Sequence, residues 1–306
     1  MAKVIKPNKL ELLACSVSES DSVDGVLWDA STSYAKDQKV RYEHVVYQSL
    51  AGSNKGNKPS ETWSGIDAKW KKIGATFPWR MLDDFVETMT TAPEGEKLTF
   101  TVPFSRANAF CLVNLQGSSV RVKVIGDGGE VDYEGTYEII KDIEGFSLYA
   151  YDYDLIESVD SIANTDVPIS IYGTLSVEID PGGPGSVAGV GHVIAGRART
   201  LGMSKYDAEV GITDYSKKET DDFGVTTFVK RSYAKVASLE LYLHPSQSDF
   251  VAATLQELRA TPSLWIGDNV DNGYTALTIY GWVEDWRSVY TGPNEQQLSV
   301  DIQGLI

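Results

Sequence analysis

Residues 28–74 read WDASTSYAKDQKVRYEHVVYQSLAGSNKGNKPSETWSGIDAKWKKIG, and this stretch indicates the fold class most clearly. Two short runs within it, residues 39–42 and 45–50, are rich in β-branched and aromatic side chains. Only Glu43 and His44 separate the two runs, and a two-residue loop is the commonest connection in a β-hairpin. The stretch therefore predicts a hairpin within a small β-module.

A third strand and an ordered loop complete the predicted module. The strand is expected over residues 69–73, and residues 54–60 are rich in Gly, Asn and Pro without periodic apolar residues. A module this small must bury aromatic side chains, because few other residues supply enough apolar area. The candidate core aromatics are Trp28, Tyr34, Tyr42, Tyr47, Trp63 and Trp70.

Outside the module, the chain shows the pattern of two further β domains. Residues 97–102, 109–115 and 119–125 have strand length and composition, and a turn at 127–129 follows them. Strands at this spacing without a helix between them favour an antiparallel sandwich.

The last part of the chain combines strands with one helix. Ser248 is a candidate N-cap, Val251, Leu255 and Leu258 have the spacing of one apolar helix face, and Pro262 follows them. The predicted fold class is mainly β: a small three-stranded module followed by two β-sandwich-like domains, the last with one helix at about 248–260.

Glycine marks the boundary between the two large domains. Residues 181–196 contain many glycines, which favour a linker or long surface loop. A phosphate-binding loop is the alternative, but neither its motif nor a following helix is present. The predicted division is an N-terminal arm at 1–27, the module at 28–76, a β-sandwich at 77–180, a Gly-rich linker or loop at 181–196, and a C-terminal β-rich domain at 197–306. The arm is expected to dock on a neighbouring domain or subunit.

Composition narrows the possible partners. The chain has 306 residues and a formal net charge of -16. A surface that binds nucleic acid needs clustered basic residues, so we do not expect nucleic acid as a partner. No apolar run is long enough to insert into a membrane. Cys15 and Cys111 are far apart without nearby metal-ligand partners, so we expect them to be reduced and buried.

Residue types that carry catalysis or bind metals are present only in weak patterns. His44, His192 and His244 are too dispersed in sequence to indicate a metal triad. Asp152 and Asp154 are a carboxylate pair without an evident aromatic cleft, and the acidic run at 268–273 departs from a calcium-binding loop and favours a plain turn. We therefore expect no enzyme activity, no cofactor and no metal.

The order of aromatic and turn residues at 28–76 resembles the carbohydrate-binding modules of chitinases and cellulases. Two departures are Asp37 in place of a glycine before Val40, and residues 50–52, Leu-Ala-Gly, in place of an exposed Trp pair. The resemblance implies a glycan-binding module. Its candidate binding residues here are Trp63, Tyr47, Trp28, Asn54 and Asn57.

Similar modules occur in virion proteins of tailed bacteriophages, followed by a segment that TFPWRMLDD at residues 76–84 resembles. Residues 201–211, 214–224 and 258–267 look like segments of phage tail-associated structural proteins. The resemblance implies a structural protein of the virion tail, at the tail tip or baseplate, synthesised in the host cytoplasm.

The partners implied are other phage tail proteins, further copies of this chain in a ring, and a host cell-surface glycan for host attachment. The alternative hypothesis is a non-catalytic glycan-binding protein, or an accessory module of a glycan hydrolase.

Overall fold

The computed structural model describes residues 1–83, 85, 88–140, 159–220, 223–224, 226–268, 275–292 and 295–305. The predicted mainly-β class is confirmed, because strands form several sheets and helices are few and short in the described parts. Within these ranges, no helix is long and apolar enough to cross a membrane.

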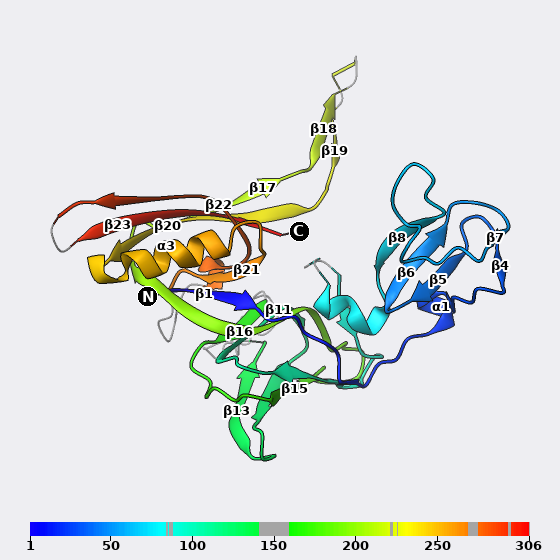
Figure 1. Cartoon of the computed structure of the whole chain (residues 1–306), viewed down its shortest axis with the longest axis horizontal. Coiled ribbons are helices and arrows are strands. Elements are labelled where there is room, and N and C mark those ends of the chain that lie inside the picture. The colour runs from blue at the N-terminus through cyan, green and yellow to red at the C-terminus, as the bar shows by residue number, and fades with distance from the viewer. Residues whose placement is uncertain are drawn as a thin grey trace, which may run out of the picture.

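The three strands predicted for the small module are present as β5, β6 and β8 (Figure 1), but the module contains further short strands that the sequence does not predict. Its main sheet has the strand order β3-β5-β6-β8, and β4 pairs with β7 beside it. Glu43 and His44 form the hairpin turn with φ values of 48° and 62°, so both residues of the two-residue loop are left-handed, as in a type I′ turn. The strand bounds are β3 Val26–Leu27, β4 Ser33–Tyr34, β5 Lys39–Tyr42, β6 Val45–Ser49, β7 Asn54–Lys55 and β8 Trp70–Ala75.

The first large unit is a sandwich of two antiparallel layers. One layer has the order β13-β12-β15-β10-β2, and the other contains β14, β11 and the first half of β16, with β9 at its end. Buried side chains alternate with more exposed ones along β10 and β15, so one face of each strand is buried between the layers. The bounds are β2 Ala14–Cys15, β9 Thr90–Thr91, β10 Leu98–Phe104, β11 Ala109–Gln116, β12 Ser119–Ile125, β13 Val131–Glu138, β14 Ser161–Asn164 and β15 Gly173–Asp180.

The two cysteines are free and lie in different layers of this sandwich. Cys111 is buried in β11, and burial raises the pKa of its thiol. Cys15 is only half-buried, so the prediction of burial is wrong for this residue. The reason is that β2 is a short strand at the edge of its sheet.

The long strand β16, Gly189–Ser204, joins the two large units. The prediction of a linker or loop is therefore wrong for residues 189–196, which pair with β11. A Cβ atom on Gly196 would lie 2.1 Å from the Lys6 carbonyl oxygen, so glycine lets a neighbouring backbone approach closely. Glycine content here reflects close strand packing and not chain flexibility.

The C-terminal unit is a sheet that rolls into a ring in the order β16-β1-β21-β22-β23-β20 and returns to β16. β1 comes from the predicted N-terminal arm and lies between β16 and β21. The predicted helix is confirmed as α3, and its Val251 and Leu255 are buried in the hydrophobic core of this unit together with Leu258 at its C-cap. The bounds are β1 Ala2–Pro7, β20 Tyr233–Leu243, α3 Ser248–Glu257, β21 Ser263–Ile266, β22 Thr278–Tyr290 and β23 Gln296–Gly304.

Short helical segments lie between these units. They are α1 Asp21–Asp24 and η1 Phe77–Leu82 on either side of the module, and η2 Pro245–Gln247 and η3 Thr275–Leu277 in the C-terminal unit.

A β-ribbon projects from the C-terminal unit at one end of the molecule, and β13 and β15 lie at the opposite end (Figure 1). The described residues of the ribbon are 209–220, 223–224 and 226–233. Its strands are β17 Glu209–Asp214, β18 Lys217–Thr220 and β19 Thr226–Val229, which leads into β20.

Candidate functional site

Two of the aromatic candidates, Tyr47 and Trp28, lie in or against the module core. Tyr47 is 5% exposed and packs with Tyr34, Val40 and Trp70. Trp28 is half-buried and meets the Tyr42 ring edge-on, with centroids 5.4 Å apart. Stacking on a sugar ring requires an exposed ring face, which the buried Tyr47 lacks and the half-buried Trp28 offers only in part.

Asn54 and Asn57 hold the loop of the module together. The buried Asn54 side chain donates to Ser49 Oγ at 3.1 Å and to the Lys69 carbonyl at 3.2 Å, and it accepts a hydrogen bond from Asn57 Nδ2 at 2.7 Å. The Asn57 carbonyl accepts from Trp70 Nε1 at 2.8 Å. These hydrogen bonds stabilise the conformation of the loop, so both side-chain amides contribute to the fold.

Trp63 is the candidate binding residue that presents an open aromatic surface. Its side chain is 45% exposed, and the Lys72 ammonium lies 5.9 Å from the ring centroid. Ile66, in the same loop, is fully exposed. The five candidate residues therefore do not form one cluster, and the available binding surface centres on Trp63.

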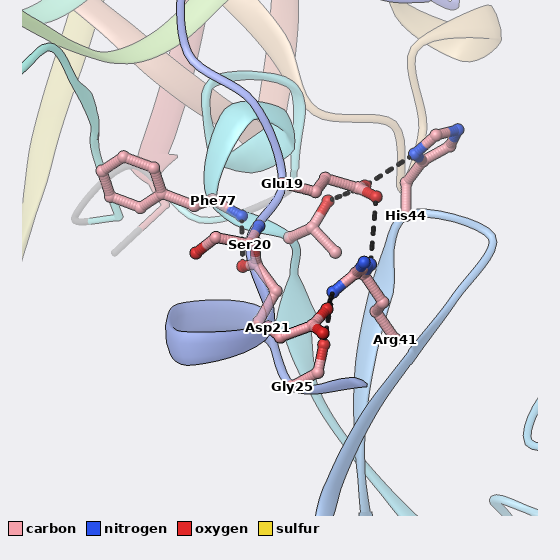
Figure 2. Close-up of polar contacts among 9 residues, drawn as sticks. Glu19, Ser20, Asp21, Gly25, Arg41, His44 and Phe77 are labelled. Atoms are coloured by element: carbon pink, nitrogen blue, oxygen red, sulfur yellow. Dashed lines mark hydrogen bonds and ion pairs between the residues drawn. The ribbon is translucent and has the colours of Figure 1, made fainter. Parts of the chain in front are cut away.

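A polar network fixes the hairpin of the module to the N-terminal segment and to η1, as Figure 2 shows. Glu19 lies at its centre: its Oε1 accepts a hydrogen bond from Thr76 Oγ1 at 2.6 Å and lies 2.9 Å from His44 Nδ1. Its Oε2 lies 3.6 Å from Arg41 Nε. The His44 ring also stacks on Trp79, with centroids 4.1 Å apart. The hairpin turn is therefore held by polar and aromatic contacts together.

Arg41 extends this network to the start of the module. Its Nη1 donates to Asp21 Oδ1 at 2.5 Å and to the Gly25 carbonyl at 2.6 Å. Gly25 has a φ of 82°, and a Cβ atom there would lie 2.6 Å from the Lys39 carbonyl oxygen. Only glycine fits this position without strain, because the backbone is left-handed and the neighbouring strand is close.

Asp24 closes the network on its other side. Its fully buried carboxylate accepts the Phe77 N–H at 2.7 Å and the Ser20 N–H at 3.0 Å. Buried carboxylates that accept backbone N–H groups make strong, directional contacts. The segments before and after the module are thus joined through one side chain.

The ionisation of Glu19 reflects its partners. Partial burial acts to raise its pKa, but the hydrogen bonds from Thr76 and His44 and the charges of His44 and Arg41 outweigh burial and hold the pKa below its ordinary value of 4.5. A carboxyl with a lowered folded-state pKa contributes stability that is present above its unfolded pKa and lost as the pH falls through its folded pKa.

We therefore expect the junction between the module and the N-terminal segment to be intact at neutral pH and to loosen below about pH 4.5. Hydrogen exchange of the amides at 19–25 and 76–77, corrected for intrinsic rates and followed from about pH 6 to about pH 3, measures this loosening. Glu19→Gln should lower protection at neutral pH and flatten its pH dependence. A pH profile that stays the same in Glu19→Gln would contradict the assignment.

The projecting ribbon is a second candidate surface. Every described residue of β17, β18 and β19 is exposed. Phe223 is 92% exposed and Phe228 is 73% exposed. An isolated two-stranded ribbon is marginally stable in water, and exposed apolar side chains at this density indicate a contact surface. The exposed apolar residues are Val210, Ile212, Tyr215, Phe223, Phe228, Val229 and Tyr233.

The first two strands of this ribbon, β17 and β18, are not among the strands predicted from the sequence. The signal is present at residues 209–214, EVGITD, where apolar side chains occupy alternate positions. Both faces of that strand are exposed, so the alternation does not mark a buried face.

Metal-ligand side chains do not gather in the parts of the chain that the structure describes. No set of His, Cys, Asp or Glu side chains there has the arrangement of a metal site. Asp152, Asp154 and residues 269–273 of the acidic run lie outside the described residues.

Comparison with known proteins found no protein-family model that matches the chain and no matching curated protein. The function is therefore inferred from the surfaces of the chain itself.

Proposed function

We propose that this protein is a non-catalytic structural component of a tailed-phage virion, at the tail tip or baseplate, and that several copies assemble around the tail. In this proposal the small module faces outward and contacts a glycan on the host surface. Other tail proteins and further copies of the chain are the assembly partners.

The observation that carries the proposal is the exposed ribbon. Its apolar side chains lie on a two-stranded extension, so the main body of the chain does not cover them. A subunit that works inside an assembly can carry such a surface, because a neighbour buries it. Burial of apolar area contributes roughly 25 cal/mol per Å², so the contact favours assembly.

The fixed position of the module supports its outward role. The Glu19 network joins the hairpin to segments on both sides, and Asp24 links Ser20 with Phe77. A binding module held in one orientation loses less conformational freedom when it binds a surface. This is what a protein at the host-facing end of a particle requires.

Co-purification with particles tests the proposal. Virions banded in a density gradient and probed with an antibody against this chain should contain the protein in the particle fraction. Its absence from intact particles, with the protein recovered only in the soluble lysate, would contradict a virion role.

The glycan contact is tested through Trp63. Trp63→Ala should weaken retention on bacterial surface polysaccharide by roughly 2- to 10-fold, because an aromatic stack contributes about 0.5–1.5 kcal/mol. Ile66→Ala, in the same loop and fully exposed, is the matched control and should bind as the unchanged protein does. Equal retention of Trp63→Ala and Ile66→Ala on a glycan array would count against stacking on this ring.

A further inference from the structure

A cavity of about 190 Å³ lies where the sandwich meets the C-terminal unit. The sandwich contributes Val113 and Asn114 of β11, and Asp160 just before β14. The C-terminal unit contributes Tyr233 and Lys235 of β20, together with parts of β22 and β23. Sites for drug-sized ligands have volumes of roughly 300–1,000 Å³, so this cavity suits a smaller molecule.

An ion pair joins the two units at this cavity. Lys235 Nζ lies 2.9 Å from Asp160 Oδ2, and both side chains are partly exposed to solvent. The described residues that line the cavity include no other Asp, Glu, Lys or Arg. The two charges therefore balance, and the described lining has no net charge.

Both members of the pair keep hydrogen-bonding capacity after they have paired. An ammonium group has three N–H donors, and a carboxylate has about four lone-pair positions. Lys235 donates one hydrogen bond to Asp160 Oδ2, and the other carboxylate oxygen, Oδ1, accepts one from Ser161 Oγ at 3.2 Å. A hydroxyl group donates and accepts at the same oxygen, so a ligand with neighbouring hydroxyls can bond to both side chains at once.

The backbone holds the polar groups of the cavity in place. Asn114 has a φ of 56°, which is left-handed backbone within β11. The next residue, Leu115, donates its N–H to the Asp160 carbonyl at 3.1 Å, so Asp160 is fixed beside this point of the strand. Left-handed backbone is uncommon in residues other than glycine, and such conformations cluster at ligand-binding sites. The polar lining is therefore in position before a ligand binds.

Two tyrosines give the cavity aromatic surface. Tyr233 is 49% exposed. Tyr280 packs against the buried His192, with ring centroids 4.6 Å apart. A sugar ring has an apolar C–H face that packs on an aromatic ring, and its hydroxyls remain available for hydrogen bonds. Aromatic rings beside a carboxylate and an ammonium therefore match the two kinds of surface that a sugar presents.

From these observations we propose that this cavity binds one neutral sugar unit. Hydroxyls of the sugar bond to Asp160 and Lys235, and its C–H face packs on Tyr233. A charged ligand fits less well, because a carboxylate meets the like charge of Asp160 and an ammonium meets that of Lys235. The site lies outside the small module, so the inference requires neither the virion role nor the glycan contact at Trp63.

Methyl NMR of the full chain tests this site directly, because Val113, Ile279 and Leu305 line the cavity and carry methyl groups. The probes are the methyl glycosides of glucose, galactose, mannose and N-acetylglucosamine. At least one of them should shift the signals of these three residues in a saturable way. Methyl signals in the sandwich core, such as those of Leu98 and Val177, should not move. Glucuronate and glucosamine, the charged counterparts, should bind more weakly than the neutral sugar.

Removing either charge should weaken binding by at least about 10-fold, because hydrogen bonds to charged groups are the stronger ones. The variants are Asp160→Asn and Lys235→Met. Lys97→Met is the matched control, since Lys97 is exposed and paired with Glu178 outside the cavity, and it should bind as the unchanged chain does. Exposed ion pairs contribute little to stability, so all three variants should keep the methyl spectrum of the core.

Absence of shifts at the three cavity residues with every neutral probe would overturn the proposal. Tighter binding of glucuronate or glucosamine would overturn it too, as would equal binding by Asp160→Asn and Lys97→Met. Trp63→Ala separates this site from the module, because it should leave the shifts at the cavity unchanged. A protein that is absent from virions but binds a sugar in the cavity keeps this site and loses the virion role.

Discussion

Trp70→Ala is expected to unfold the small module while the two larger β units stay folded. Trp70 is fully buried, its ring meets Tyr34 with centroids 5.5 Å apart, and its Nε1 donates to the Asn57 carbonyl at 2.8 Å. Truncating a buried Trp costs about 3–5 kcal/mol. A module with so small a core has little more stability than this to lose.

Proteolysis and hydrogen exchange measure this effect. Trypsin should cut Trp70→Ala at the lysines of residues 36–72, and the amides of β5 and β6 should lose protection, while those of β10, β12 and β16 keep it. Trp63→Ala is the matched control, because the exposed Trp63 side chain contributes little to the core. A module that stays protected in Trp70→Ala would show that its stability does not depend on this aromatic core.

Gly196→Ala should destabilise the large β units and not act as a neutral change in a linker. An added Cβ atom would lie 2.1 Å from the Lys6 carbonyl oxygen and 3.1 Å from Ile5 Cγ2, so β1 must move away from β16. Overpacking of this kind costs typically about 1–3 kcal/mol, and here the obstacle is a backbone atom and not a flexible side chain.

Gly183→Ala is the matched control from the same glycine-rich stretch. A Cβ atom on Gly183 would have no neighbour within 4 Å, so the free energy of unfolding should change by less than about 0.5 kcal/mol. Urea denaturation of both variants gives the comparison. Equal midpoints for Gly196→Ala and Gly183→Ala would contradict the close packing of β1 on β16.

The sequence predicts those elements whose pattern is local. The hairpin at 39–50 follows from two alternating runs and a two-residue turn, and α3 follows from the spacing of Val251, Leu255 and Leu258. In each case the residues that determine the element are close together in the sequence. Local periodicity is enough to predict such elements.

The closure of the C-terminal ring could not be predicted in this way. β1 pairs with residues near 200 and with residues near 265, and nothing local in residues 2–7 identifies either partner. The prediction at 189–196 was wrong because glycine is common in loops as well as in closely packed strands. Which of the two applies depends on residues far away in the sequence. The same reasoning applies to the candidate site, where Tyr47 and Trp63 are both aromatic but only the fold decides which one is exposed.

The central claim, that this chain is a tail component of a phage particle, is tested most directly by immunogold electron microscopy of intact virions. An antibody against the chain should place gold at the distal end of the tail, in several copies per particle. Virions that carry no label, or that carry it on the capsid, would contradict the claim.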